Sequence, residues 1–201
     1  MSTSLAAERP RIRLIQGRER RVQSGHPWIY SNELRMDAAA RALPPGGLVA
    51  VEDFRARPLG CATFNPHSLI AARLLDPDPQ ASIDAGWIAG RLRRALALRQ
   101  RLFADPFHRL VHAEADGLPG LVIDRFGELL VLQLNTAGMD RLAEPLLEAL
   151  EEVLAPKAVV LRNDSPVRKL EGLDLHVRLA RGSLPEAPRI EEGGASFRAD
   201  P

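Results

Sequence analysis

Asp76-Pro77-Asp78-Pro79 interrupts the chain between two regions with different hydrophobic patterns. Each proline fixes its own φ and pushes the residue before it out of the α region, so neither a strand nor a helix should continue through this segment. Short strand-like segments precede the break, and a long amphipathic helical pattern follows it. We therefore predict two domains, one over residues 10–78 and a second over residues 79–200.

The region before the break has the pattern of short strands separated by turns. Pro44-Pro45-Gly46-Gly47 precedes the apolar run 48–51, and Asn65-Pro66-His67-Ser68 separates the candidate strands 59–64 and 69–75. Short strands divided by glycine and proline turns are typical of a small β-barrel or a β-sandwich. The sequence predicts an all-β first domain and leaves these two architectures open.

The region after the break alternates between helical and strand periods. Residues 84–103 have a helical period, with Ser82 as the expected N-cap. Pro145 predicts that the later helix, 139–154, starts late or kinks. The strand candidates are 110–114, 121–123, 129–134, 157–161, 173–179 and a pair over 190–198. A strand-strand-helix-strand-strand order behind a linker helix predicts an α+β second domain.

Composition limits the classes of function. The net charge of +1 excludes a globally basic nucleic-acid binder, so a nucleic-acid surface would have to be local. Cys61 is the only cysteine, which excludes an intrachain disulfide and a thiolate metal cluster and fits a reducing cytoplasm. No apolar run approaches the roughly 20 residues that span a bilayer. We expect a cytoplasmic protein with no metal and no membrane partner.

Residues 17–30, GRERRVQSGHPWIY, combine arginines with aromatic rings. Guanidinium groups pair with phosphates, and flat rings offer stacking surfaces for unpaired bases. The alternative is that the rings belong to the core, as large aromatic side chains usually do. We predict RNA contacts from six side chains of this segment: Arg18, Arg20, Arg21, His26, Trp28 and Tyr30.

Two further basic segments could also contact RNA. The loop that holds Arg168 and Lys169 is a second predicted RNA contact, with surface ion pairs as an equal alternative. The 84–103 helix has a basic face that includes Arg94 and Arg101. This face could meet phosphate, but such runs are more often solvated helix surfaces.

Five blocks of sequence together carry a resemblance to a known family. They are residues 18–30, 65–73, 114–127, 167–173 and 190–192. The most specific is EADGLPGLVIDRFG at 114–127, followed by the His-Pro-Trp block at 26–28. With these blocks the chain resembles the bacterial class I S-adenosylmethionine-dependent methyltransferases that modify C5 of a cytosine in 23S ribosomal RNA, of the large-subunit methyltransferase I type. The resemblance covers residues 11–200, nearly the whole chain.

The resemblance implies a fold. Proteins of that family have an N-terminal PUA domain, which is a small RNA-binding β-barrel, then a central domain and a Rossmann-like catalytic domain. We expect the fold class α+β, with a PUA-like β-barrel followed by a strand-strand-helix-strand-strand domain. We expect no Rossmann methyltransferase domain in this chain, because its glycine clusters do not lie between a strand and a helix, as a methyl-donor site requires.

The resemblance also implies a chemistry. A cysteine thiolate activates the cytosine ring in that family, and Cys61 is the only candidate here. Cys61 lies in a strand of the first region with no cofactor motif around it, so we expect a small buried residue. We therefore expect no catalytic residue and no cofactor in this chain, although S-adenosylmethionine serves the full-length family.

The functional expectation follows from these points. The sequence predicts the RNA-binding N-terminal portion of an rRNA cytosine-C5 methyltransferase, cut at a domain border, which positions 23S rRNA for a catalytic domain. The alternative is a complete, non-catalytic RNA-binding or assembly module. A fragment that mainly packs against a second copy, as a homodimer, is a third reading.

Overall fold

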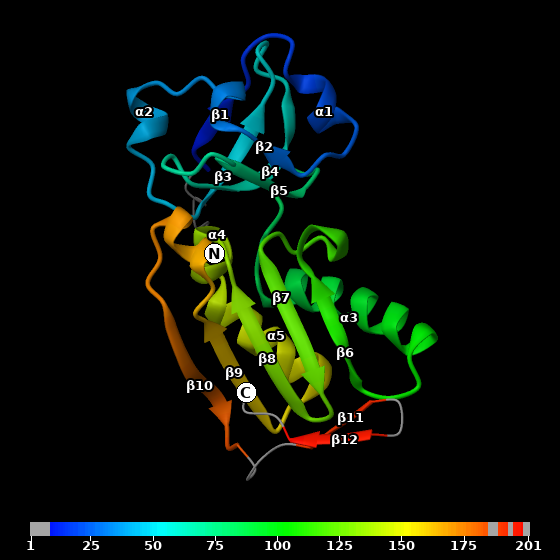
Figure 1. Ribbon diagram of the computed structural model, residues 1–201. Coiled ribbons are helices and arrows are strands. Elements are labelled where there is room, and N and C mark those ends of the chain that lie inside the picture. Colours follow the sequence, from blue (N-terminus) through cyan, green and yellow to red (C-terminus); the bar gives the residue numbers. More distant parts are fainter. Residues whose placement is uncertain (1–8, 185–188, 193–194, 199–201) are drawn as a thin grey trace, which may run out of the picture. The chain divides into compact units, whose positions relative to one another are not determined.

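The computed structural model describes residues 9–184, 189–192 and 195–198. The chain divides into two compact units, unit 1 over residues 1–81 and unit 2 over residues 82–201 (Figure 1). Within the described residues, no helix combines the length and the apolar character that crossing a membrane requires.

Unit 1 is built on one five-stranded sheet with the order β1-β3-β4-β5-β2. Strands β1 and β3 are parallel, and the other neighbours are antiparallel. The elements are β1 (Arg11–Arg13), α1 (Glu19–Gln23), β2 (Trp28–Ile29), the 3-10 turn η1 (Ser31–Glu33), α2 (Ala38–Arg41), β3 (Gly47–Glu52), β4 (Pro58–Phe64) and β5 (Ala72–Asp76).

Contacts just after the two edge strands close this sheet on itself. Leu14 and Leu34 form an antiparallel bridge, and the Ile15 amide donates to the Glu33 carbonyl at 2.9 Å. Joining the edge strands removes the exposed sheet edges that favour aggregation. The enclosed core contains the alternating apolar side chains of the strands and of α1: Ile12, Leu14, Val22, Ile29, Leu34, Val49, Val51, Ala62, Phe64, Ala71 and Ala72.

Asp53 fixes the hairpin between β3 and β4. Its carboxylate accepts hydrogen bonds from the amides of Arg55 and Arg57, at 2.8 and 2.9 Å, and from Nε of Arg57 at 2.6 Å. Burial alone would raise the pKa of Asp53, but the hydrogen bonds from Arg57 and Arg55 outweigh it and hold the pKa below its ordinary value. The charged Asp53 carboxylate therefore stabilises this turn by accepting hydrogen bonds from its backbone amides.

Unit 2 contains a five-stranded mixed sheet with the order β10-β9-β8-β7-β6. Only β8 and β9 are parallel among these neighbours. The elements are α3 (Ala85–Leu102), β6 (Phe107–His112), the 3-10 turn η2 (Ala113–Asp116), β7 (Leu121–Phe126), β8 (Leu129–Leu134), α4 (Ala137–Arg141), α5 (Ala143–Leu154), β9 (Ala158–Asn163), the 3-10 turn η3 (Pro166–Glu171), β10 (His176–Gly182) and a two-stranded ribbon of β11 (Arg189–Glu192) and β12 (Ala195–Arg198).

Helices α3 and α5 pack against each other in this unit (Figure 1). Helix α3 buries Ile88 and Leu92, and α5 buries Leu146 and Leu150, each at the three- and four-residue spacing of one helix face. The N-cap of α3 is Asp84, whose Oδ1 accepts from the Trp87 amide at 2.9 Å. The expected cap, Ser82, is wrong because the helix begins two residues later, where the carboxylate complements the helix dipole.

The helical pattern over 139–154 forms two helices that are joined at Leu142. Thr136 starts α4 earlier than predicted, because its Oγ1 accepts from the Met139 amide at 3.2 Å. Pro145 lies in the first turn of α5, where its missing N–H removes no helical hydrogen bond. These two helices connect the parallel strands β8 and β9, so unit 2 contains one β-α-β crossover.

Candidate nucleic-acid interface

Two of the predicted arginines are exposed at the start of α1, Arg18 as its N-cap residue and Arg20 within the helix. Val22 is buried in the core of unit 1 and fixes the orientation of this short helix. Arg18 and Arg20 are exposed, and neither guanidinium makes a hydrogen bond or ion pair with any residue that the structure describes. Their charges are therefore not neutralised by any of the described side chains and can meet an anion.

Arg21 points inward and holds its neighbours in place. Its Nη2 donates to the Trp28 carbonyl at 2.8 Å and contacts Glu33 Oε2 at 3.4 Å, and its Cζ lies 5.1 Å from the centre of the Tyr30 ring. Glu33 is only 8% exposed and also accepts from the Tyr30 amide at 2.8 Å. Arg21 thus orders Tyr30 and Trp28 and is partly neutralised.

The three aromatic side chains lie at the boundary between core and solvent. His26, Trp28 and Tyr30 are each half-buried. His26 and Trp28 meet edge to face, with ring centres 6.0 Å apart and planes at 76°, and the Trp28 amide donates to His26 Nδ1 at 3.2 Å. The rings are therefore held by the protein while part of each faces outward. We call Arg18, Arg20, Arg21, His26, Trp28 and Tyr30 the α1 surface.

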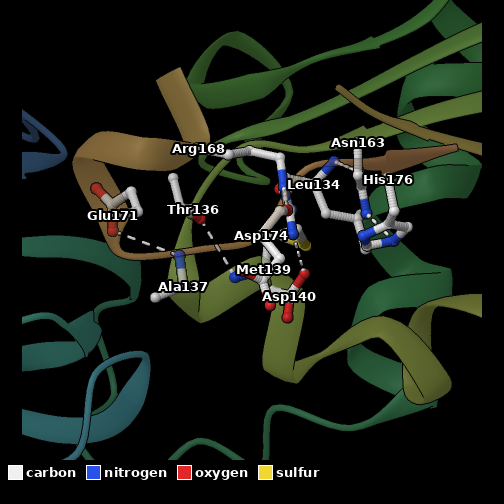
Figure 2. A network of polar contacts seen from close by, with 10 residues as sticks. All are labelled: Leu134, Thr136, Ala137, Met139, Asp140, Asn163, Arg168, Glu171, Asp174 and His176. Atoms are coloured by element: carbon white, nitrogen blue, oxygen red, sulfur yellow. Dashed lines mark hydrogen bonds and ion pairs between the residues drawn. The ribbon is translucent and has the colours of Figure 1, made fainter. Parts of the chain in front are cut away.

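Arg168 and Lys169 belong to unit 2 and are not part of the α1 surface. Arg168 is 2% exposed, and its guanidinium donates to the carbonyls of Leu134 and Asp174 and to Asp140 Oδ1, the last two at 3.0 and 2.9 Å (Figure 2). Because all of these acceptors are within the protein, Arg168 fastens η3 to the end of β8. The geometry gives Arg168 a structural role, and we leave it out of the proposed RNA surface. Its neighbour Lys169 is exposed to solvent.

More buried polar groups complete this network (Figure 2). Asn163 Oδ1 accepts from the Leu134 amide at 2.8 Å, and its amide nitrogen lies 3.2 Å from His176 Nε2. Glu171 Oε2 accepts from the Ala137 amide at the start of α4 at 3.3 Å. The carboxyl ends of the parallel strands β8 and β9 are therefore filled by the protein's own side chains.

Formal charge is unequal between the two units. Unit 1 has 11 arginines and 8 acidic residues, a net charge of +3. Unit 2 has 16 basic and 18 acidic residues, a net charge of −2. The small net charge of the chain therefore conceals a basic unit 1, which favours an anionic partner on that unit.

Cys61 lies in β4 and is completely buried. Burial raises the pKa of its thiol to about 11, with the carboxylates of Asp76 and Asp78 adding to the rise and the charge of Arg9 opposing it. A buried neutral thiol cannot act as a nucleophile near neutral pH.

The state of Cys61 predicts a labelling result. A thiol reagent such as 5,5′-dithiobis(2-nitrobenzoic acid) at pH 7.5 should label the unfolded chain within minutes and leave the folded chain unlabelled over the same time. The release of the coloured thiolate measures both rates. Rapid labelling of the folded protein would contradict the buried, protonated state.

A family model for PUA-like domains matches residues 12–77, which include the closed sheet and the α1 surface. Unit 1 contains a PUA-like domain. Over 195 residues, the chain is 37% identical to proteins named ribosomal RNA large subunit methyltransferase I from Shigella boydii and Escherichia coli, and 36% identical to the one from Cronobacter sakazakii. These matches cover 94% of this chain and 48% of each relative, so the chain spans about half the length of the curated relatives it matches.

Two solved structures share the fold. One is a candidate SAM-dependent methyltransferase from Streptococcus mutans, with a TM-score of 0.74 over 94% of this chain and 48% of that protein. The other is a candidate methyltransferase in complex with SAH, with a TM-score of 0.76 over 94% of this chain and 47% of that protein. Both are 15% identical to this chain, so the likeness concerns the backbone path.

These structures correct the expected fold class. The expectation of an α+β chain with no methyltransferase-like domain is wrong, because 94% of the chain follows the backbone of methyltransferase structures. That expectation rests on the absence of a glycine-rich turn between a strand and a helix in the sequence. Local glycine patterns do not reveal strand direction, and the parallel pair β8–β9 with its helical crossover went unpredicted for this reason.

The carboxyl ends of parallel strands are where such folds usually bind nucleotide-like cofactors. At this edge, Arg168 occupies the space beside the Leu134 carbonyl and Glu171 accepts from the first amide of α4, Ala137. The Leu134 carbonyl and the Ala137 amide at this edge are therefore already bonded to the protein. The described residues at this edge do not fit the cofactor, and we assign no catalytic step to them.

Proposed function

We propose that this chain binds large-subunit ribosomal RNA through the α1 surface and serves an S-adenosylmethionine-dependent rRNA methyltransferase. The observation that carries the proposal is the pair of exposed arginines, Arg18 and Arg20, whose guanidinium groups have no partner among the described residues, in the same segment as rings that the protein holds in place. The PUA-like match and the names of the relatives support an RNA partner.

The two kinds of group on the α1 surface have different roles. Arg18 and Arg20 contact phosphates, which supply most of the affinity and make it salt-dependent. Trp28 and Tyr30 offer faces for unpaired bases. Because Arg21 already lies over the Tyr30 ring and Glu33 holds both Arg21 and the Tyr30 amide, binding costs little side-chain ordering there.

The finer assignment rests on the relatives and on the sequence blocks at 18–30 and 114–127. We propose 23S rRNA as the partner and C5 of a cytosine as the position that is methylated, with S-adenosylmethionine as the methyl donor. In this assignment the chain recognises and positions the RNA, and ribosomal RNA places its action in the cytoplasm.

Neutralising the two exposed arginines tests the proposal. The double variant Arg18→Gln, Arg20→Gln should lower the slope of log Kd against log salt by roughly two, one for each lost phosphate contact. Fluorescence anisotropy with a labelled hairpin from large-subunit rRNA, at several salt concentrations, measures this slope. Both side chains are exposed, so thermal unfolding should be unchanged.

The matched control removes two charges from the other basic surface. Arg94 and Arg101 are exposed on α3 in unit 2, and the double variant Arg94→Gln, Arg101→Gln should keep the wild-type slope. An unchanged slope in the α1 variant, or the same fall in both variants, would contradict the assignment to the α1 surface.

A further inference from the structure

Unit 1 has a surface cleft of about 490 Å³ that no sequence motif predicted. Three separate segments form it: η1 and the residues after it, the end of α2, and the loop between β4 and β5. The side chains that line it include Asn32, Leu34, Met36, Arg41, His67 and Leu69. A cleft of this volume is within the usual range for small-ligand sites.

Backbone hydrogen bonds hold the walls of this cleft in place. The Ser31 amide donates to the Leu69 carbonyl at 2.9 Å, which ties η1 to the β4–β5 loop. Within that loop, the Asn65 amide donates to the Ala71 carbonyl at 2.7 Å, and Asn65 Oδ1 accepts from the His67 amide at 3.1 Å. The cleft is therefore largely preformed.

Its chemistry suits a flat, anionic ligand. Leu34, which is 5% exposed, and Met36 provide apolar surface, and Leu69 stands out from the protein with 72% of its surface exposed. Asn32 and His67 are exposed, and their side chains have no hydrogen-bond partner among the described residues. They can meet the polar edge of a ligand.

Arg41 is the only arginine or lysine among the described residues that line this cleft. Its Nε donates to the Met36 carbonyl at 3.0 Å, and its two Nη groups make no hydrogen bond with the described residues. A second cleft of unit 1 differs, because Glu52 there binds Arg11 and Arg13 at 3.2 and 2.8 Å. The Arg41 charge in the first cleft is thus not paired with a carboxylate of the part of the chain that the structure describes.

We propose that this cleft receives one unpaired nucleotide of the RNA strand that the α1 surface holds. The base lies against Leu34, Met36 and Leu69, and a phosphate meets Arg41. The two sites share one stretch of chain, because Tyr30 of the α1 surface directly precedes Ser31 at the cleft. Unpaired bases that leave the stack and enter a pocket are the usual targets of single-strand RNA recognition. This inference rests on the proposed function.

Two RNA probes and one variant pair test the apolar part of the cleft. The probes are a hairpin with an unpaired loop and a blunt duplex with the same stem. Leu69→Asn keeps the side-chain size and removes the apolar contact, so it should weaken hairpin binding about tenfold and leave duplex binding unchanged. Leu170→Asn, at the equally exposed Leu170 of unit 2, is the control and should change neither.

Arg41→Gln tests the phosphate contact. It should reduce the salt slope by about one for the hairpin and leave the slope for the duplex unchanged. If both cleft variants keep the wild-type hairpin-to-duplex ratio while Arg18→Gln, Arg20→Gln still weakens both probes, the cleft inference is wrong and the proposed function stands. If the α1 variant also changes nothing, the proposed function itself is wrong.

A free nucleotide carries the same base and phosphate as a nucleotide of an RNA strand, so it is the other ligand that the cleft could bind. A mixture of nucleoside monophosphates at millimolar concentration should leave the labelled hairpin bound, because the strand is also held by the α1 surface. Displacement of the hairpin from wild-type protein, but not from Leu69→Asn, would show that a free nucleotide is the ligand and would overturn the proposal of a strand.

Discussion

Replacing Arg168 with methionine should lower the free energy of unfolding by about 3–5 kcal/mol. The Arg168 guanidinium is buried and donates to the Leu134 and Asp174 carbonyls and to Asp140. Methionine fills a similar volume but leaves these acceptors without a donor. Urea unfolding followed by circular dichroism at 222 nm measures the loss, since that signal comes chiefly from α3 and α5.

The neighbouring residue provides the control for this prediction. Lys169→Met removes an equal charge from the same 3-10 turn, but Lys169 is exposed and should change the free energy of unfolding by less than about 0.5 kcal/mol. Arg168→Lys should also be strongly destabilising, because an ammonium group cannot span three acceptors in a plane. Equal stability of the Arg168→Met and Lys169→Met variants would show that the buried network contributes nothing.

Gly120→Ala should destabilise the chain by about 3 kcal/mol, as a sum of backbone strain and a forced displacement. Gly120 has a φ of +77°, and an added Cβ would lie 2.2 Å from Thr136 Cγ2. Thr136 is buried and caps α4 through the Met139 amide, so moving it weakens the start of that helix. The same urea titration measures the effect.

The variant Gly127→Ala separates the cost of backbone strain from the cost of displacing a neighbouring side chain. Gly127 has a similar φ of +64°, but a Cβ there would meet no atom within 4 Å. This variant should therefore carry only the cost of the left-handed conformation, about 1–2 kcal/mol. If Gly120→Ala is no more costly than Gly127→Ala, the close approach to Thr136 has no energetic consequence.

Periodicity predicted single elements well where one face of the element is buried. The predicted helix 84–103 is found as α3 over 85–102, because Ile88 and Leu92 mark a continuous apolar face. Strand direction was not predictable, because an alternating or apolar strand looks the same whether its neighbour runs parallel or antiparallel. The parallel pairing of β8 with β9 was therefore visible only in the structure.

The candidate site was predictable in one respect and not in two others. Arginines and rings that are close in sequence can come into contact, as Arg21 and Tyr30 do, because only a short helix and a short strand separate them. The burial of Arg168 was not predictable, since its acceptors come from β8, α4 and the residues before β10. The cleft at Leu69 was also missed, because its walls come from residues 31–41 and 66–69, and no local sequence pattern indicates that these two segments meet.

Cross-linking of the RNA complex tests the central claim most directly. A large-subunit rRNA hairpin that carries 4-thiouridine is bound to the wild-type 201-residue chain, irradiated and digested, and the linked peptides are identified by mass spectrometry. Our account predicts that the linked peptides come from residues 18–36 and 65–71 of unit 1. Cross-links confined to unit 2, for example to the exposed face of α3, would contradict it.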